Sequence, residues 1–420
     1  MRYEIPYGRQ QLIFEMDAPV ETLMTTKAQI PLEKRDMVKK AMKHPIGSPR
    51  LVDIARGKKN AVIVINDITR PSPSQLFVEE ISQELNQAGI SDSEITLLVA
   101  TGNHRANTEE ELIGMVGEGI YKRFSIKNHN ASDQDQLVDL GKTTRGLEVI
   151  VNRLVVESEL TILTGIITPH QSAGFSGGRK SIVPGVAGLK SLEHHHSFPI
   201  RPEYPVMGLM THNTFHEEAV EAARKVGVDF IVNVVKNSEG EIASVVAGDL
   251  VEAHEKGVQD CKKVWAVKVK TKFDVTIVSP GGYPKDFDMH QAQKALATAE
   301  MVTKPGGSII LVAECADGSG KFAQLLMDAR DPQEVIDYFK KVGFKSKNHS
   351  SKAFMYARVL QKHDVYFVTD KIDPIDLKKM FFIPSATVES AYRNARAKCV
   401  DEPKIALIPF AVDCLIEMEE

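Results

Sequence analysis

Short apolar runs that alternate with helical segments constrain the fold of this chain more than any other feature. Three strong runs lie in its first half, at 61–66 (AVIVIN), 95–100 (ITLLVA) and 160–165 (LTILTG). Brief apolar runs of this kind, each followed by polar turn residues and a helical segment, are typical of buried strands in a parallel sheet. The chain is therefore predicted to be an α/β protein with largely parallel sheets flanked by helices.

A second series of strands and helices begins after a short basic segment, 266–272 (AVKVKTK). A chain of 420 residues is long enough for two domains. We expect an N-terminal cofactor- and metal-binding domain over 1–268 and a C-terminal α/β domain over 274–398, with the active site in the crevice between them. The last segment, 399–420, contains a further strand that could return to the N-terminal domain.

Composition excludes several classes of function. The formal net charge of −4 and a pI near 6.4 give no reason to expect nucleic acid as a partner. No apolar run approaches the roughly 20 residues that span a bilayer, and the N-terminus has no apolar signal segment. Cys261, Cys315, Cys399 and Cys414 lie far apart, as reduced thiols usually do. These features predict a soluble cytoplasmic enzyme, and they leave open whether it is a homo-oligomer.

Polar residues follow the first two apolar runs. Asp67, Thr69 and Arg70 come after the first run, and His104 follows the second. Because the carboxyl ends of parallel strands converge on one crevice, these clusters are predicted to meet there. An arginine at such a place could bind a carboxylate or phosphate through two N–H groups, and a histidine could act as general base. A structural role is also open for both, with Arg70 capping strand-end carbonyls.

The third run leads into a glycine-rich stretch, 168–188 (TPHQSAGFSGGRKSIVPGVAG), in which five glycines from Gly174 to Gly188 bracket Lys180. Dense glycines allow backbone N–H groups to approach an anion, although the spacing matches neither a Walker A loop nor a dinucleotide-binding turn. The stretch predicts a phosphate site. Lys180 would contact the phosphate or, as a second reading, attach a cofactor covalently. His170, just before the glycines, is a candidate acid–base group.

Two further groups are open to a functional or a structural interpretation. The three consecutive histidines at 194–196 could supply only one or two ligands to one metal ion, because neighbouring side chains on a helix point about 100° apart. A surface run is the simpler interpretation. In the second half, His290 and Lys294 lie one helical turn apart with Gln291 beside them, which is also the pattern of a solvated helix face.

Taken together, these clusters resemble the lactate racemase family, whose members use a nickel-pincer nucleotide. The match runs in order through most of the chain, and its element P-H-Q-x-x-G-F-S-G-G-x-K, from Pro169 to Lys180, is specific. The other matching positions are Asp67, Arg70, Gly102, His104, Arg105, His196, Gln291 and Lys294.

The resemblance implies a cofactor site in the first half of the chain. Lys180 resembles the lysine that bonds covalently, through a thioamide, to the nickel-pincer nucleotide (pyridinium-3-thioamide-5-thiocarboxylic acid mononucleotide nickel). His196 resembles the histidine that ligates nickel. Further cofactor contacts are expected from Asp67, Thr69, Gly174, Ser176, Gly177 and Gly178. The family also implies separate cofactor-biosynthesis proteins as partners.

The same resemblance implies an isomerase that racemises a 2-hydroxy acid, or epimerises it at C2, by proton-coupled hydride transfer to the cofactor. His104 and His170 match the two acid–base histidines on opposite sides of the substrate. Arg70 and Lys294 match the cations that hold its carboxylate, with Gln291 beside them. An oxidative route suits a substrate whose C2–H is only weakly acidic. A racemase also requires two bases on opposite sides of the substrate and a cofactor that is regenerated in each cycle.

One position departs from the family. His290 stands where lactate-specific members have a tyrosine, so it is expected to contact a substrate side chain that could be longer or more polar than that of lactate. Two other functions stay open. One is a sensor or carrier that binds a nucleotide or hydroxy acid without turnover. The other is a metal-dependent hydrolase of a phosphorylated substrate, for which Asp67 is the obvious carboxylate ligand.

Overall fold

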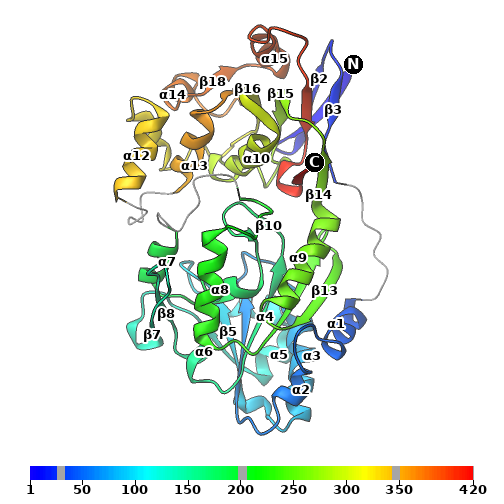
Figure 1. Cartoon of the computed structure of the whole chain (residues 1–420), viewed down its shortest axis with the longest axis vertical. Helices are drawn as coiled ribbons and strands as arrows, with labels where there is room; N and C mark the ends of the chain where they lie inside the picture. Colours follow the sequence, from blue (N-terminus) through cyan, green and yellow to red (C-terminus); the bar gives the residue numbers. More distant parts are fainter. Residues whose placement is uncertain (26–33, 197–205, 343–350, 420) are drawn as a thin grey trace. The chain divides into compact units, whose positions relative to one another are not determined.

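The computed structural model describes residues 1–25, 34–196, 206–342 and 351–419 (Figure 1). Contacts divide the chain into two compact units. We call residues 27–202 and 208–264 the middle unit, and residues 1–26, 203–207 and 265–420 the terminal unit, because it contains both ends of the chain. No helix in the described ranges is both long and apolar enough to cross a membrane.

The middle unit is built on a six-stranded sheet with the order β13-β12-β9-β4-β5-β6. All neighbouring strands are parallel except the edge strand β13, which is antiparallel to β12. The first two predicted strands are found as predicted, and the third begins one residue later and continues to Ile167. The bounds are β4 (Ala61–Asn66), β5 (Ile95–Ala100), β6 (Ser125–Asn128), β9 (Thr161–Ile167), β12 (Phe230–Lys236) and β13 (Ile242–Gly248).

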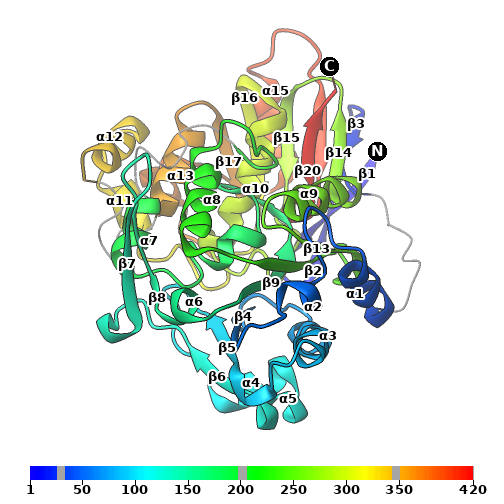
Figure 2. The same cartoon turned by 60° about the horizontal axis from the view of Figure 1, so that its bottom comes forward.

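Alternating residues of this sheet face two separate apolar cores, so that Ile63 and Val99 pack on one face and Val62 and Leu98 on the other. Figure 2 shows the helices of the first core gathered on one side of the sheet. They are α1 (Lys34–Lys43), α2 (Leu51–Ile54), α3 (Ser74–Gln87), α4 (Glu109–Val116) and α5 (Glu118–Arg123). The other face is covered by the hairpin β7 (Leu137–Lys142) and β8 (Glu148–Asn152), with α6 (Leu154–Glu157), α7 (Leu189–His195), α8 (Thr214–Val226) and α9 (Glu252–Trp265).

The terminal unit has its own six-stranded parallel sheet, with the order β18-β17-β16-β15-β19-β3. Its strands are β3 (Val20–Thr22), β15 (Phe273–Val278), β16 (Thr303–Val312), β17 (Asp364–Val368), β18 (Ile383–Ser385) and β19 (Ile405–Ile408). The helices are α10 (Met289–Val302), α11 (Ala323–Met327), α12 (Pro332–Val342), α13 (Ser351–Leu360), α14 (Pro374–Lys379) and α15 (Val388–Arg396). The hairpin of β1 (Arg2–Tyr7) and β2 (Gln10–Glu15) and the pair of β14 (Ala266–Val269) with β20 (Leu415–Met418) complete this unit.

These units differ from the predicted domains at both ends of the chain. Residues 1–26 were expected in the N-terminal domain, but β3 pairs with β19, and Ile5 and Phe14 pack in the core beneath β15. The segment 399–420 was considered for the same domain, yet β19 pairs with β15 in the terminal unit. Strand pairing over such long sequence separations decides both assignments.

Candidate active site

The three strongest strands of the middle unit lie side by side, because β4 pairs in parallel with β9 on one side and β5 on the other. Their carboxyl ends therefore reach the same edge of the sheet. A backbone hydrogen bond of 2.9 Å from the N–H of Gly102 to the carbonyl of Gly185 ties the loop after β5 to the glycine-rich stretch after β9. The prediction that the polar residues after the first two strands meet at one edge is confirmed, and the glycine-rich stretch after the third strand joins them there.

Asp67 and His104 form a hydrogen-bonded pair at this edge. Nδ1 of His104 lies 2.7 Å from Oδ2 of Asp67, and the hydroxyl of Thr69 donates to Oδ1 of the same carboxylate at 2.8 Å. Burial alone would raise the pKa of Asp67, but the hydrogen bonds from His104 and Thr69, with the nearby charges, outweigh it and lower the pKa. The carboxylate orients His104 in this structure, and its expected contact with a cofactor stays a prediction.

Two arginines lie at the same edge, and only one of them is bound to a carboxylate. Arg70 is exposed, and its guanidinium donates to the carbonyl of Thr69 at 3.1 Å. Arg105 instead forms two hydrogen bonds with the carboxylate of Glu111, at 2.6 and 2.8 Å. Arg70 is therefore the better placed of the two to bind an anionic ligand through its guanidinium.

His170 lies in a short hairpin, where β10 (Pro169–His170) pairs with β11 (Gly174–Phe175). Its Nδ1 accepts hydrogen bonds from the backbone N–H groups of Ser172 and Ala173, both 3.1 Å long. The ring also stacks on Phe215, with 6.4 Å between the ring centroids. The hairpin and Phe215 together fix the position of this imidazole.

His196 lies at the end of α7 and contacts the same phenylalanine. Its Nδ1 donates to the carbonyl of Leu192 at 2.9 Å, and its ring meets Phe215 edge-on at 5.2 Å. The interpretation of the three histidines as a surface run is wrong: His195 is completely buried, and its Nε2 donates to the carbonyl of Phe215. Phe215, which the sequence analysis missed, thus brings the candidate acid–base and metal-binding histidines to one aromatic ring.

The glycines near Ser176 are explained by close packing within the protein. A Cβ on Gly177 would lie 2.5 Å from the side-chain oxygen of Asn233, and one on Gly178 would lie 2.9 Å from the ring of His254. The N–H of Gly178 donates to that Asn233 oxygen at 2.7 Å. Close packing thus accounts for Gly177 and Gly178, and the phosphate site stays a prediction.

A buried arginine fixes the loop just before Lys180. The guanidinium of Arg179 donates to the carbonyls of Ala173 at 2.8 Å and Gly177 at 3.2 Å, and it contacts His254 at 2.9 Å. Burial lowers the pKa of Arg179 to about 9. The sequence analysis missed this residue, although it stands directly beside the half-buried Lys180. Its hydrogen bonds determine how the backbone presents that lysine.

Buried histidines make the middle unit sensitive to acid. Burial lowers the pKa of His129 to about 4 from an ordinary 6.5. Between these two pH values the unfolded chain binds a proton that the folded protein does not, so stability falls as the pH falls. As the pH falls through this range, protonation of His129 in the unfolded chain is expected to lower the free energy of unfolding by about 3 kcal/mol. Denaturant titrations of wild-type protein and His129→Gln should show a smaller loss in the variant, and equal losses would contradict the assignment.

The remaining predicted residues lie on α10 of the terminal unit. Asp288 caps this helix by accepting from the N–H of Gln291 at 2.7 Å, and Nζ of Lys294 donates to Oε1 of Gln291 at 2.6 Å. His290 is exposed, yet the protein packed around its ring, with the charge of Lys352, lowers its pKa to about 4. The structure thus brings His290, Gln291 and Lys294 together, with His290 as a neutral group near neutral pH.

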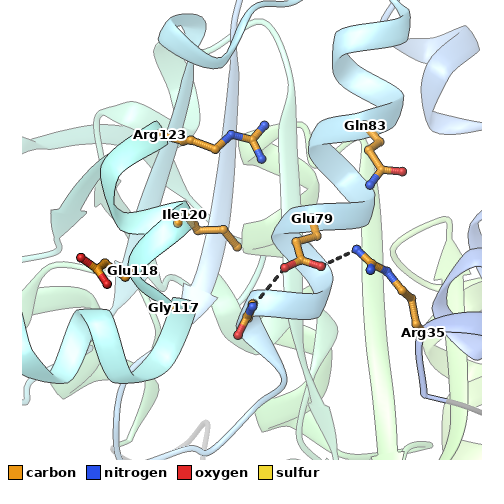
Figure 3. Close-up of a pocket in the computed structure, with 9 residues that line it drawn as sticks. Arg35, Glu79, Gln83, Gly117, Glu118, Ile120 and Arg123 are labelled. Carbon is orange, nitrogen blue, oxygen red and sulfur yellow. Dashed lines mark hydrogen bonds and ion pairs between the residues drawn. The ribbon is translucent and has the colours of Figure 1, made fainter.

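A pocket of about 330 Å³ in the middle unit lies among α1, α3 and α5 (Figure 3). None of the predicted site residues lines it. Its Arg35 is bound to Glu79, which also accepts a hydrogen bond from Gln75 at 3.0 Å. Three of its polar side chains thus bind one another, and the pocket is not the candidate active site.

Comparisons with known proteins match both halves of the chain. Residues 7–207 match the model of the lactate racemase N-terminal domain, and residues 268–416 match that of the lactate racemase C-terminal domain. A lactate racemase of Thermoanaerobacterium thermosaccharolyticum is 34% identical over 421 residues, covering 98% of each chain. A lactate racemase of Lactiplantibacillus plantarum is 36% identical over 391 residues, covering 92% of each.

Solved structures agree with these matches. The lactate racemase apoprotein of Thermoanaerobacterium thermosaccharolyticum has a TM-score of 0.88 and 33% identity, over 99% of this chain and 100% of that one. A protein of Thermotoga maritima, at 18% identity and a TM-score of 0.62, shares the fold. The two matched domains and the near-full-length relatives show that this chain is a racemase that belongs to the lactate racemase family.

Proposed function

We propose that this protein interconverts the enantiomers of lactate or a related 2-hydroxy acid with a nickel-pincer nucleotide bound at Lys180. The observation that carries the proposal is that His170 and His196 meet at Phe215 while His104 lies at the adjoining sheet edge, with a ring nitrogen of each histidine held by a hydrogen bond. The names of the two relatives, both lactate racemases, point to the substrate class.

The residues present fit this cofactor. A metal-binding imidazole usually donates its other N–H to a carbonyl, as Nδ1 of His196 does to Leu192, and Nε2 then becomes the ligand atom. Within the described ranges, no three His, Cys, Asp or Glu side chains form a metal site by themselves. A single imidazole suits a nickel ion whose other donors belong to the nucleotide. Lys180, half-buried on a loop fixed by Arg179, would supply the attachment amine.

When bound, the nucleotide would supply an acceptor for the hydride of C2. His104, supported by Asp67, takes the hydroxyl proton at Nε2, while His170 serves the opposite side of the substrate. Arg70 would hold the carboxylate, and the hydrogen-bonded pair of Lys294 and Gln291 keeps its predicted role as a second cation and an amide. Holding the carboxylate would keep the planar keto acid in the site while it turns from one face to the other.

His290 affects the choice of substrate side chain. Because its pKa is lowered to about 4, its ring is neutral at neutral pH and offers a hydrogen bond instead of a positive charge. This favours a hydroxyl or other neutral polar group on the substrate over a second carboxylate.

All four cysteines are free thiols, in keeping with a cytoplasmic enzyme. We propose that this enzyme receives its cofactor from separate biosynthesis proteins.

The test is a chiral assay of protein produced beside a cofactor-synthesis pathway. L-lactate and larger 2-hydroxy acids with neutral polar side chains would each be supplied as one enantiomer. We expect conversion of at least one of them toward an equal mixture. A loaded protein that binds these acids and converts none of them would favour the carrier function and contradict the proposal.

A further inference from the structure

We propose that the protein holds its two active-site histidines in opposite neutral tautomers and that Asp67 is the positioning residue of His104. His104 would carry its hydrogen at Nδ1 and accept protons at Nε2, whereas His170 would carry its hydrogen at Nε2. The catalytic consequence rests on the proposed function, but the tautomers themselves do not.

The tautomer of His104 follows from its partner. Asp67 is 4% exposed and its pKa is lowered, so it is an ionised acceptor at neutral pH. An ionised carboxylate 2.7 Å from Nδ1 requires a hydrogen on that nitrogen. The lone pair of a neutral His104 is therefore at Nε2. If Nε2 takes a proton, the resulting imidazolium keeps its Nδ1–H on the carboxylate and gains a charged partner.

The tautomer of His170 follows from two donors. The backbone N–H groups of Ser172 and Ala173 both point at Nδ1, at 3.1 Å, so this nitrogen must be the acceptor. The hydrogen of the neutral ring is then at Nε2. His129 is a reference for this tautomer. Its Nδ1 accepts from the amide group of Asn152 at 3.2 Å, and its Nε2 donates to the carbonyl of Ala187 at 3.0 Å.

In the state that the structure describes, the two histidines therefore differ in whether the ring can accept a proton without losing a hydrogen bond. The O–H bond of a substrate facing His104 can break with formation of an Nε2–H bond on that ring, with no rearrangement of its partners. His170 can donate a hydrogen bond from Nε2, but protonating it at Nδ1 requires giving up both backbone hydrogen bonds. The structure therefore assigns to His104 the proton of the enantiomer whose hydroxyl faces that ring, and for the other enantiomer His170 must release its backbone contacts before it can carry a second proton.

The tautomers can be read directly by ¹⁵N NMR of full-length protein labelled at histidine, near neutral pH. Protonated and unprotonated ring nitrogens differ in chemical shift, and His104→Gln and His170→Gln would assign the two rings. We expect an Nδ1–H signal pattern for His104 and the Nε2–H pattern of His129 for His170. The same tautomer in both active-site rings would overturn the proposal, whether or not the protein racemises any substrate.

Asp67→Asn tests the positioning role. Thr69 donates to Oδ1 of residue 67, so the amide oxygen should stay there and the amide nitrogen should face His104. His104 is then expected to switch to the Nε2–H tautomer. Racemisation per mole of bound nickel should fall by about 10²- to 10⁴-fold. Arg105→Gln, a change at the neighbouring exposed residue, is the matched control and should keep the wild-type tautomer. An Nδ1–H signal that persists in Asp67→Asn would refute the role of Asp67.

Discussion

Alanine at position 104 or 170 is expected to lower racemisation by about 10²- to 10⁴-fold in each case, because each change removes a proton-transfer group. Neither change removes Lys180 or His196, so the cofactor should still load. The Asp67–His104 pair and the backbone-held His170 are separate arrangements, and one cannot replace the other. Chiral chromatography of the product would measure the rate, with nickel content and intact mass as measures of loading.

His44→Ala is the matched control for these two variants, because His44 is an exposed histidine of the same unit. It should keep wild-type activity. If His104→Ala and His170→Ala both stay active at full loading, two-histidine catalysis fails for this chain. If only one of the two variants loses activity, the histidine replaced in the active variant is not needed, and a different group transfers the proton on its side of the substrate.

Lys180→Ala should remove the covalent cofactor and with it all racemisation. The lysine follows Arg179, whose buried guanidinium holds the carbonyls of Ala173 and Gly177, so the amine is presented from a fixed backbone. Intact mass under denaturing conditions should show an adduct of nucleotide size on the wild-type protein and none on the variant. Nickel should be reduced in parallel, because His196 alone would hold it weakly.

Lys190→Ala provides the control, because Lys190 is an exposed lysine of the same unit that pairs with Glu148 at 2.6 Å. It should retain the adduct. An adduct of unchanged mass on Lys180→Ala would mean that another residue is the attachment point. No adduct on the wild-type protein, in a host that loads a known family member, would reduce Lys180 to a possible phosphate contact.

The sequence was sufficient to predict the features that depend on local pattern. The apolar runs at 61–66 and 95–100 became β4 and β5, and the polar residues after them meet at one sheet edge as predicted. This succeeded because a run of consecutive apolar residues indicates a strand buried on both faces, and parallel strands bring their carboxyl ends together.

Features set by contacts distant in sequence could not be predicted. Nothing local in residues 20–22 indicates that they pair with β19 near the other end of the chain. Nor could the sequence show that Asn233 and His254 occupy the space that side chains at 177 and 178 would need. The role of Phe215 depends equally on tertiary packing, since its ring meets two histidines from other segments.

The most direct test of the account uses L-lactate, or the best substrate from the chiral screen, carrying deuterium at C2, with loaded wild-type protein in ordinary water. If hydride leaves C2 and returns to the opposite face while His104 and His170 move only the hydroxyl proton, the product enantiomer should retain its deuterium. Chiral separation followed by mass spectrometry would measure this retention. A product that has exchanged its C2 deuterium for solvent hydrogen would contradict hydride transfer, and no product from any acid tested would contradict the racemase function proposed for this site.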